Sequence, residues 1–188
     1  MTELSAQDFQ KVYEDLGIDI PKLGCIMLDV PALPVVELLG DDAESMLYTS
    51  ENKERFWIKG AVGAKTAHVT LQYGLMESGV KWKKHVNTVL DGWELPMVTI
   101  DKISFFPSPF ADENYSCIVG LVSVTDELME GHHRLQMLPH IDTNPGYKPH
   151  VTLAYVNTAD TNKAIMALRP LRGMPLEPVA LNYGKNHS

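Results

Sequence analysis

Two short segments of the chain have nearly the same sequence, and each contains a histidine and a threonine two positions apart. His68-Val-Thr-Leu-Gln-Tyr73 and His150-Val-Thr-Leu-Ala-Tyr155 are identical at five of six positions. A histidine can accept or donate a proton near neutral pH, so two histidines that face one substrate can do both in one turnover. Threonine hydroxyls can donate hydrogen bonds to the non-bridging oxygens of a phosphate. The repeated segment therefore predicts acid–base cleavage of a phosphodiester.

Both segments are rich in β-branched residues, which favours β-strands. Side chains alternate along a strand, so His68 and Thr70 are expected on one face, and the same holds for His150 and Thr152. The apolar residues of each segment, together with its tyrosine, are expected on the opposite face. We predict that the four polar side chains meet in one cleft, where they need neither a metal nor a cofactor.

The elements around the two segments also repeat. The first half of the chain predicts strands at residues 24–30, 68–75 and 97–106, with helices at 32–39 and 80–90 between them. The second half predicts strands at 115–124, 150–156 and 177–183, with helices at 126–138 and 160–168. Residues 40–67 are too long for a bare connection and are interpreted as an inserted flap. We expect a single domain over residues 1–188, with one lobe at about 20–106 and a second at about 113–185 related by a pseudo-twofold axis.

The composition limits the possible partners. The chain has 188 residues, of which 45% are hydrophobic, so it is long enough to bury a core. Its net charge of −8 argues against a protein that coats nucleic acid through a basic face, but is compatible with a small anionic ligand. Cys25 and Cys117 lie in apolar runs and are expected to be buried thiols. There is no signal-peptide pattern or bilayer-spanning run, so a cytoplasmic protein is expected.

A metal site is the competing use for the histidines. His132, His133 and His140 precede the second segment, but the chain has no His-Glu-x-x-His or Cys-x-x-Cys pattern. We therefore expect no metal, and we interpret His132 and His133 as solvated residues on a helix surface.

The segments at His68-Val-Thr-Leu71 and His150-Val-Thr-Leu153 resemble the 2H phosphoesterase superfamily, which is named for two His-x-Thr or His-x-Ser motifs. The resemblance implies an α+β fold of duplicated antiparallel sheets, bilobal, with helices on the outer faces. It also implies that the His and Thr pairs are catalytic and phosphate-binding. Which histidine is the acid and which is the base stays open, although the resemblance favours His68 on the nucleophile side.

Within this superfamily the chain is similar to the phage anti-CBASS phosphodiesterases in its short length, its acidic net charge and its inserted flap. That similarity implies cleavage of 3′-5′ linkages in cyclic di- or trinucleotide immune signals, in the host cytosol if the protein is phage-encoded. The alternative is a 2′,3′-cyclic phosphodiesterase that acts on RNA ends or small cyclic phosphates. A second alternative is a non-catalytic nucleotide-binding module. In each case the partner is a small anionic nucleotide, with no long nucleic acid, membrane or obligate protein partner.

Further residues are candidates for substrate binding. Gln72 is expected to continue the cleft face after Thr70, and Trp57 lies in the flap, where it could close over the substrate. Phe105, Phe106 and Tyr115 flank the connection between the lobes and offer either stacking faces or core contacts.

The remaining candidates surround the second segment. Tyr147 and Lys148 immediately precede it and could stack on a base and neutralise a phosphate. Glu177 is expected to begin the last strand, and the anti-CBASS similarity implies an acidic residue downstream of the second motif.

Overall fold

The structure is a computed structural model, and it describes Asp15, residues 23–141 and residues 146–184. Its strands are β1 Gly24–Val30, β2 Ala67–Leu75, β3 Val98–Pro107, β4 Tyr115–Val122, β5 His150–Asn157, β6 Pro175–Leu176 and β7 Ala180–Gly184. Its α-helices are α2 Val35–Leu39, α3 Ala43–Met46, α4 Lys83–Val89, α5 Asp126–Leu135 and α6 Thr161–Leu168. Short 3-10 turns complete the described elements.

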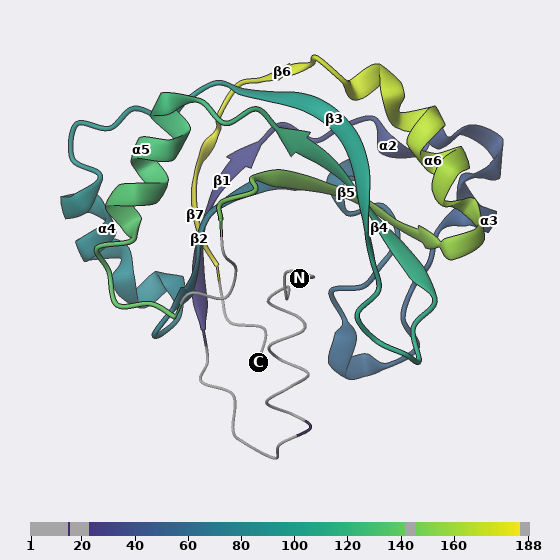
Figure 1. The fold of residues 1–188 in the computed structure, drawn as a ribbon, viewed down its shortest axis with the longest axis horizontal. Helices are drawn as coiled ribbons and strands as arrows, with labels where there is room; N and C mark the ends of the chain where they lie inside the picture. Colours follow the sequence, from purple (N-terminus) through teal and green to yellow (C-terminus); the bar gives the residue numbers. More distant parts are fainter. Residues whose placement is uncertain (1–14, 16–22, 142–145, 185–188) are drawn as a thin grey trace.

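All described strands belong to one antiparallel sheet in the order β6-β3-β4-β5-β2-β1-β7. The two strands with the repeated segment, β2 and β5, lie side by side near its centre, joined through Val69 and Val151. The sheet bends into an arch with the helices on its outer side (Figure 1). We call β7-β1-β2 the first half of the sheet and β5-β4-β3-β6 the second half. The expected α+β class with duplicated antiparallel strands and outer helices is confirmed.

The third strand of each sequence half belongs to the other half of the sheet. β3 follows β2 and α4 in the chain, but it pairs with β4. β7 ends the second sequence half, but it pairs with β1. In each half of the sheet, a motif strand is therefore followed by one strand from its own sequence half and then by one from the other. The exchange preserves the pseudo-twofold relation while mixing the two sequence halves.

The outer face of the sheet forms the main core. Helices α4 and α5 cover the first half of the sheet, and α2, α3 and α6 cover the second (Figure 1). Removal of this apolar surface from water is the main stabilising contribution to the fold. Fully buried side chains under the helices include Ile26, Leu28, Val69, Leu71, Ile118, Val151 and Leu153.

The predicted flap packs against the far end of β5. The Tyr48 N–H donates to the Tyr155 carbonyl at 2.9 Å, and the Tyr155 N–H donates to the Gly60 carbonyl at 2.8 Å. The buried carboxylate of Glu113 accepts hydrogen bonds from the Tyr48 and Ser50 hydroxyls and forms an ion pair with Arg55 at 3.1 Å. A second apolar cluster forms there from Ile58, Phe110, Tyr115 and Tyr155, with Trp57 packed on it. Residues 48–60 of the flap are therefore held in a fixed position against this end of β5.

Local sequence signals predict the bounds of most elements to within a few residues of those observed. Thr125 caps α5 as its sequence predicts, because its hydroxyl oxygen accepts from the Leu128 N–H at 3.2 Å. The strand expected at 177–183 is wrong: residues 175–176 form β6 against β3, and β7 begins only at Ala180. The chain crosses from one edge of the sheet to the other between these strands.

The two cysteines are free thiols on β1 and β4. Burial raises the pKa of Cys25 to about 11 and that of Cys117 to about 12. Within the described residues, no helix has the length and apolar character needed to cross a bilayer.

Candidate active site

The contact between β2 and β5 brings both His-x-Thr pairs to one place. Because Val69 pairs with Val151 in an antiparallel arrangement, His68 lies across from Thr152, and Thr70 lies across from His150. Opposite Cβ atoms in such pairs are about 4.5–5.5 Å apart, and diagonal residues, here the two histidines, are roughly 7–8 Å apart. All four side chains are partly exposed on the inner face, whereas both valines are buried on the outer face.

Both strands contain a bulge directly after the threonine. Met27 pairs with Thr70 but Ile26 pairs with Gln72, so one residue of β2 is extra. The same shift occurs on β5, where Val119 pairs with Thr152 and Ile118 pairs with Ala154. A bulge changes which face the following residues occupy. The bulge is therefore part of the repeated structure, and it follows the same residue in each copy.

The bulge overturns two predictions about side-chain direction. Tyr73 and Tyr155 are expected from alternation on the apolar face, but they pair with Cys25 and Cys117 on the inner face. The prediction that Gln72 extends the inner face is also wrong, because it pairs with the fully buried Ile26 and is itself 5% exposed. The Gln72 amide nitrogen donates to the Tyr73 carbonyl at 2.8 Å. Gln72 therefore lies under the helices and away from the two histidines.

His150 is held in one tautomer by the segment that precedes its strand. Its Nδ1 lies 2.9 Å from the Lys148 carbonyl oxygen. A carbonyl can only accept, so Nδ1 carries the proton and Nε2 keeps the lone pair of the neutral ring. Burial lowers the pKa of His150, with the bond to Lys148 acting in the opposite direction. The neutral ring, which can accept a proton at Nε2, is favoured.

An aromatic ring lies beside His150. Phe106 of β3 packs edge-to-face against it, with ring centroids 5.1 Å apart and an interplanar angle of 84°. Phe106 remains 37% exposed, which leaves part of its ring open to a ligand on the inner face. It is the one stacking candidate that the structure brings directly to a motif histidine among the described residues.

His68 has a different neighbour. Asp29 of β1 pairs with it directly, and both side chains are on the inner face. The Asn182 amide of β7 donates to the Asp29 carboxylate at 3.1 and 3.4 Å. Sequence reasoning missed both residues. The available signal was that Asp29 is the charged residue of an otherwise apolar strand, at a position whose alternation places it on the inner face.

The residues just upstream of His150 hold the bulge of β2. The Tyr147 hydroxyl donates to the Thr70 carbonyl at 2.9 Å, and its ring stacks on His132 at a centroid distance of 3.9 Å. His132 Nδ1 lies 2.6 Å from the Leu71 carbonyl oxygen, so Nδ1 donates to it. The interpretation of His132 as a solvated surface residue is therefore wrong. One ring face of Tyr147 is covered by His132, and the carbonyl of Lys148 contacts His150.

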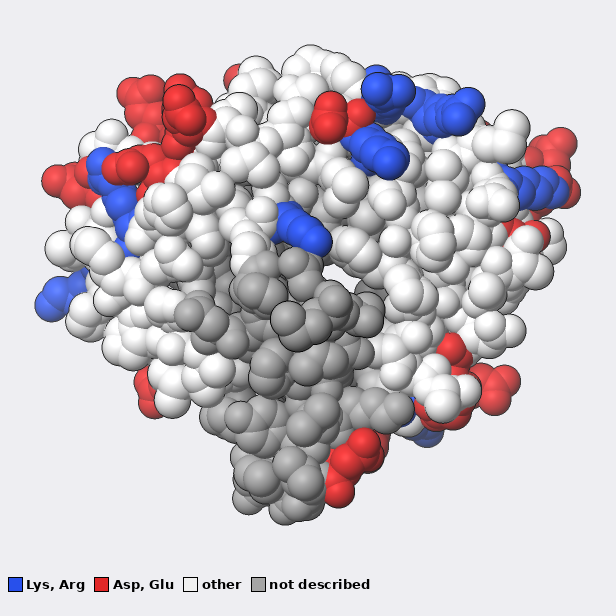
Figure 2. Space-filling view, in the orientation of Figure 1, with Lys and Arg blue, Asp and Glu red and all other residues white. Residues whose placement is uncertain are grey.

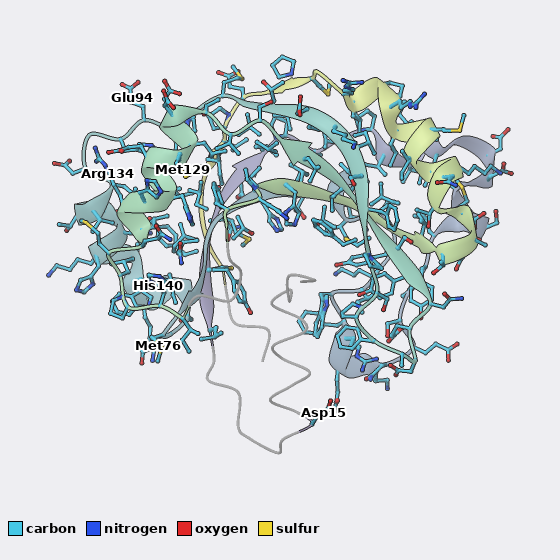
Figure 3. All side chains as sticks on the ribbon, viewed as in Figure 1. Asp15, Met76, Glu94, Met129, Arg134 and His140 are labelled. Carbon is cyan, nitrogen blue, oxygen red and sulfur yellow. The ribbon has the colours of Figure 1, made fainter. Side chains whose placement is uncertain are left out.

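The remaining candidates belong to other parts of the fold. Trp57 is half-buried in the flap cluster. Glu177 is exposed in the connection between β6 and β7, outside the strand in which it was expected. His140 lies near Met76 at the lower end of the first half of the sheet, away from the flap (Figure 3). It forms an isolated antiparallel β-bridge with Leu75. Among the described residues, no group of three or more His, Cys, Asp or Glu side chains is placed to hold a metal ion.

Charged side chains are unevenly distributed on the face that Figure 2 shows. Asp and Glu gather at the upper left and lower right, and Lys and Arg gather mainly at the upper right. One basic side chain is visible beside the hollow at the centre of the view. A protein that follows a long nucleic acid strand needs a continuous basic track. The described part of this face does not show one.

Comparisons with known proteins show a likeness in fold. No protein-family model matches the chain, and no curated protein matches it in sequence. Usb1 of Kluyveromyces marxianus superposes with a TM-score of 0.53 at 13% identity, over 89% of this chain and 95% of that one. A structure of Usb1 from the same organism with uridine monophosphate gives a TM-score of 0.43 at 13% identity, over 81% and 80% of the two chains. The first of these likenesses extends over nearly the whole of both chains, and it shows that the protein has the fold of Usb1.

Proposed function

We propose that the protein is a phosphodiesterase that acts on RNA ends and on small 2′,3′-cyclic phosphates. The observation that supports this most is the pairing of β2 with β5, which brings His68, Thr70, His150 and Thr152 together on the inner face. Two imidazoles at a diagonal separation can contact opposite sides of one phosphate. The two hydroxyls can then donate to its non-bridging oxygens.

In the first step the neutral His150 accepts the proton of a ribose 2′-hydroxyl at Nε2. The 2′ oxygen forms a bond to phosphorus while the bond from phosphorus to the leaving 5′ oxygen breaks. His68 gives a proton to that leaving oxygen, so the products are a 2′,3′-cyclic phosphate and a free hydroxyl. In the second step a water replaces the leaving hydroxyl, the histidines exchange roles, and the ring opens to a phosphomonoester. Both histidines then regain their starting protonation states.

The substrate assignment rests on three observations. Usb1, with which the fold is shared, is a phosphodiesterase of the 3′ end of U6 snRNA, and this supports the RNA-end alternative over the cyclic oligonucleotide one. Phe106 gives one stacking surface beside His150, enough for a terminal nucleoside. The net charge of −8 favours a short anionic substrate over a long nucleic acid. The four polar groups are all present, which favours turnover over binding alone.

The test is cleavage in the presence of EDTA. The substrates are a short RNA with a free 3′ end, the same RNA with a 2′,3′-cyclic phosphate, a 2′,3′-cyclic mononucleotide, and cyclic di- and trinucleotides. We expect cleavage of RNA ends and cyclic mononucleotides. His68→Ala and His150→Ala should each lower kcat/KM by roughly 10²- to 10⁴-fold, the contribution of a positioned acid or base.

The matched control is His133→Ala, because His133 is an exposed histidine on α5. It should keep full activity. The proposal fails if every substrate stays intact, or if both motif variants remain fully active. Preferential cleavage of the cyclic di- or trinucleotides would restore the immune-signal alternative.

A further inference from the structure

The two copies of the motif have the same residues but different partners on the adjacent strand. In the first half of the sheet, Asp29 of β1 pairs directly with His68. In the second half, Leu121 of β4 occupies the equivalent position, opposite His150. Cross-strand partners share a face, with Cβ atoms about 4.5–5.5 Å apart. A carboxylate therefore lies beside one histidine, and an aliphatic side chain lies beside the other.

The Asp29 carboxylate is fixed by the next strand. The Asn182 amide nitrogen of β7 lies 3.1 Å from Oδ1 and 3.4 Å from Oδ2, and an amide nitrogen can only donate. The Asp29 backbone carbonyl accepts from the Val179 N–H at 2.9 Å. Donation from Asn182 therefore holds the carboxyl group of Asp29 from the side of β7. The equivalent of Asn182 in the second half is Ser104, which lies across from Val119.

The surroundings of His150 favour its neutral ring over the imidazolium. Leu121 and Phe106 give it apolar neighbours, and its Nδ1 proton is donated to the Lys148 carbonyl. Nothing in this set of contacts supplies a negative charge to stabilise an imidazolium. Two histidines that are followed by the same three residues are thereby given different electrostatic environments by β1 and β4.

We infer that Asp29 is a positioning residue that stabilises the protonated form of His68 and so makes His68 the proton donor to the leaving oxygen. This inference rests on the proposed function. The carboxylate attracts the imidazolium, which loses one proton to the leaving oxygen as the phosphorus–oxygen bond breaks. Among the described residues on the adjacent strands, Asp29 and His150 are the titratable groups that face His68. His150 acts as the base in the same step and takes the proton of the 2′-hydroxyl.

Two substrates with the same nucleophile and different leaving groups test this assignment. Uridylyl-(3′,5′)-uridine expels a ribose alkoxide, which needs a proton. Uridine 3′-(para-nitrophenyl phosphate) expels para-nitrophenolate, which leaves without one. Asp29→Asn should lower kcat on the dinucleotide by roughly 10- to 100-fold, a part of the contribution of a general acid, and leave the para-nitrophenyl ester nearly unaffected.

The variants His68→Ala and His150→Ala calibrate the result. His68→Ala should show the same dependence on leaving group, only larger, and His150→Ala should lose activity on both substrates. Asp29→Glu should restore part of the loss on the dinucleotide. Ser104→Ala, at the equivalent of Asn182 in the second half, is the matched control and should show no dependence on leaving group. The ratio of the two rates is insensitive to a misfolded fraction, which lowers both equally.

Equal losses on both substrates for Asp29→Asn, or no loss on either, would overturn the inference and leave the proposed function intact. Wild-type protein that cleaves neither substrate would overturn the proposed function and this inference with it.

Discussion

The first and second halves of the sheet place the same segment in the same way but support it differently. β2 is held by side chains of α5 and of the segment that precedes β5, where His132 and Tyr147 donate to the carbonyls of its bulge. β5 is held by the backbone of the flap, through Tyr48 and Gly60. The repeated sequence therefore determines which groups reach the inner face. The unrepeated neighbours determine how each copy is held and which charge it favours.

The largest expected effect comes from the two threonines, one in each half of the sheet. Thr70→Val and Thr152→Val remove one hydroxyl each at nearly constant volume. Each should lower kcat by roughly 10²- to 10³-fold, because loss of one donor to the developing phosphate charge costs that much in comparable sites. Thermal melting measured beside kcat checks that the fold is retained.

The comparison between these two variants is itself informative. Similar losses would show that both halves stabilise the phosphate, as the paired register implies. A loss confined to one variant would show that the phosphate is bound by one half alone, and would contradict the four-residue site.

Much of this arrangement follows from sequence patterns. The order of strands and helices, the Thr125 cap and the inner-face position of both His-x-Thr pairs follow from periodicity and capping rules. A repeated segment with polar residues two apart is a strong signal, because packing alone gives no reason to repeat it.

The bulges do not follow from the sequence, because Leu71 and Leu153 look like ordinary strand residues, and a bulge is a property of the pair of strands. The wrong expectations for Gln72, Tyr73 and Tyr155 all follow from this. The exchange of β3 and β7 is hidden for a related reason, since pairing partners far apart in the chain leave no local pattern. Asp29 was missed because its pairing with His68 is visible only in the register.

A stability difference is expected where the two copies diverge in sequence. Gly74 of β2 corresponds to Val156 of β5. Gly74 has a φ of 83°, and a Cβ built there would lie 2.2 Å from the Ile141 carbonyl oxygen. Gly74→Ala should therefore destabilise the protein by about 3 kcal/mol, the sum of left-handed strain and a backbone clash.

The control for this variant is Gly92→Ala. Gly92 has a similar φ of 74°, but a Cβ added there would meet nothing within 4 Å, so its cost should be about 1–2 kcal/mol. Urea denaturation at equilibrium measures both. Equal losses of unfolding free energy in the two variants would mean that residues 139–141 shift easily to accommodate the added Cβ. These residues would then not fix the position of β2.

The smallest expected effect is a shift in the pH dependence of kcat/KM, and it is expected only from a substitution beside His150 in the second half. His150 must be neutral to act as base, so the rate falls as the pH drops through its pKa. Burial lowers that pKa below its usual value of 6.5, and the acidic limb of kcat/KM for the para-nitrophenyl ester should have its midpoint below 6.5.

Phe106→Ala gives water access to the His150 ring and should move this midpoint upward. Phe106 lies across from Cys117, and the equivalent residue of the first half is Gly184, which lies across from Cys25. β7 therefore places no aromatic ring at that position. Asp29→Asn should leave the acidic limb where it is. A wild-type midpoint at or above 6.5, or an acidic limb that moves with Asp29 and not with Phe106, would assign the base to His68 and reverse the roles of the two halves.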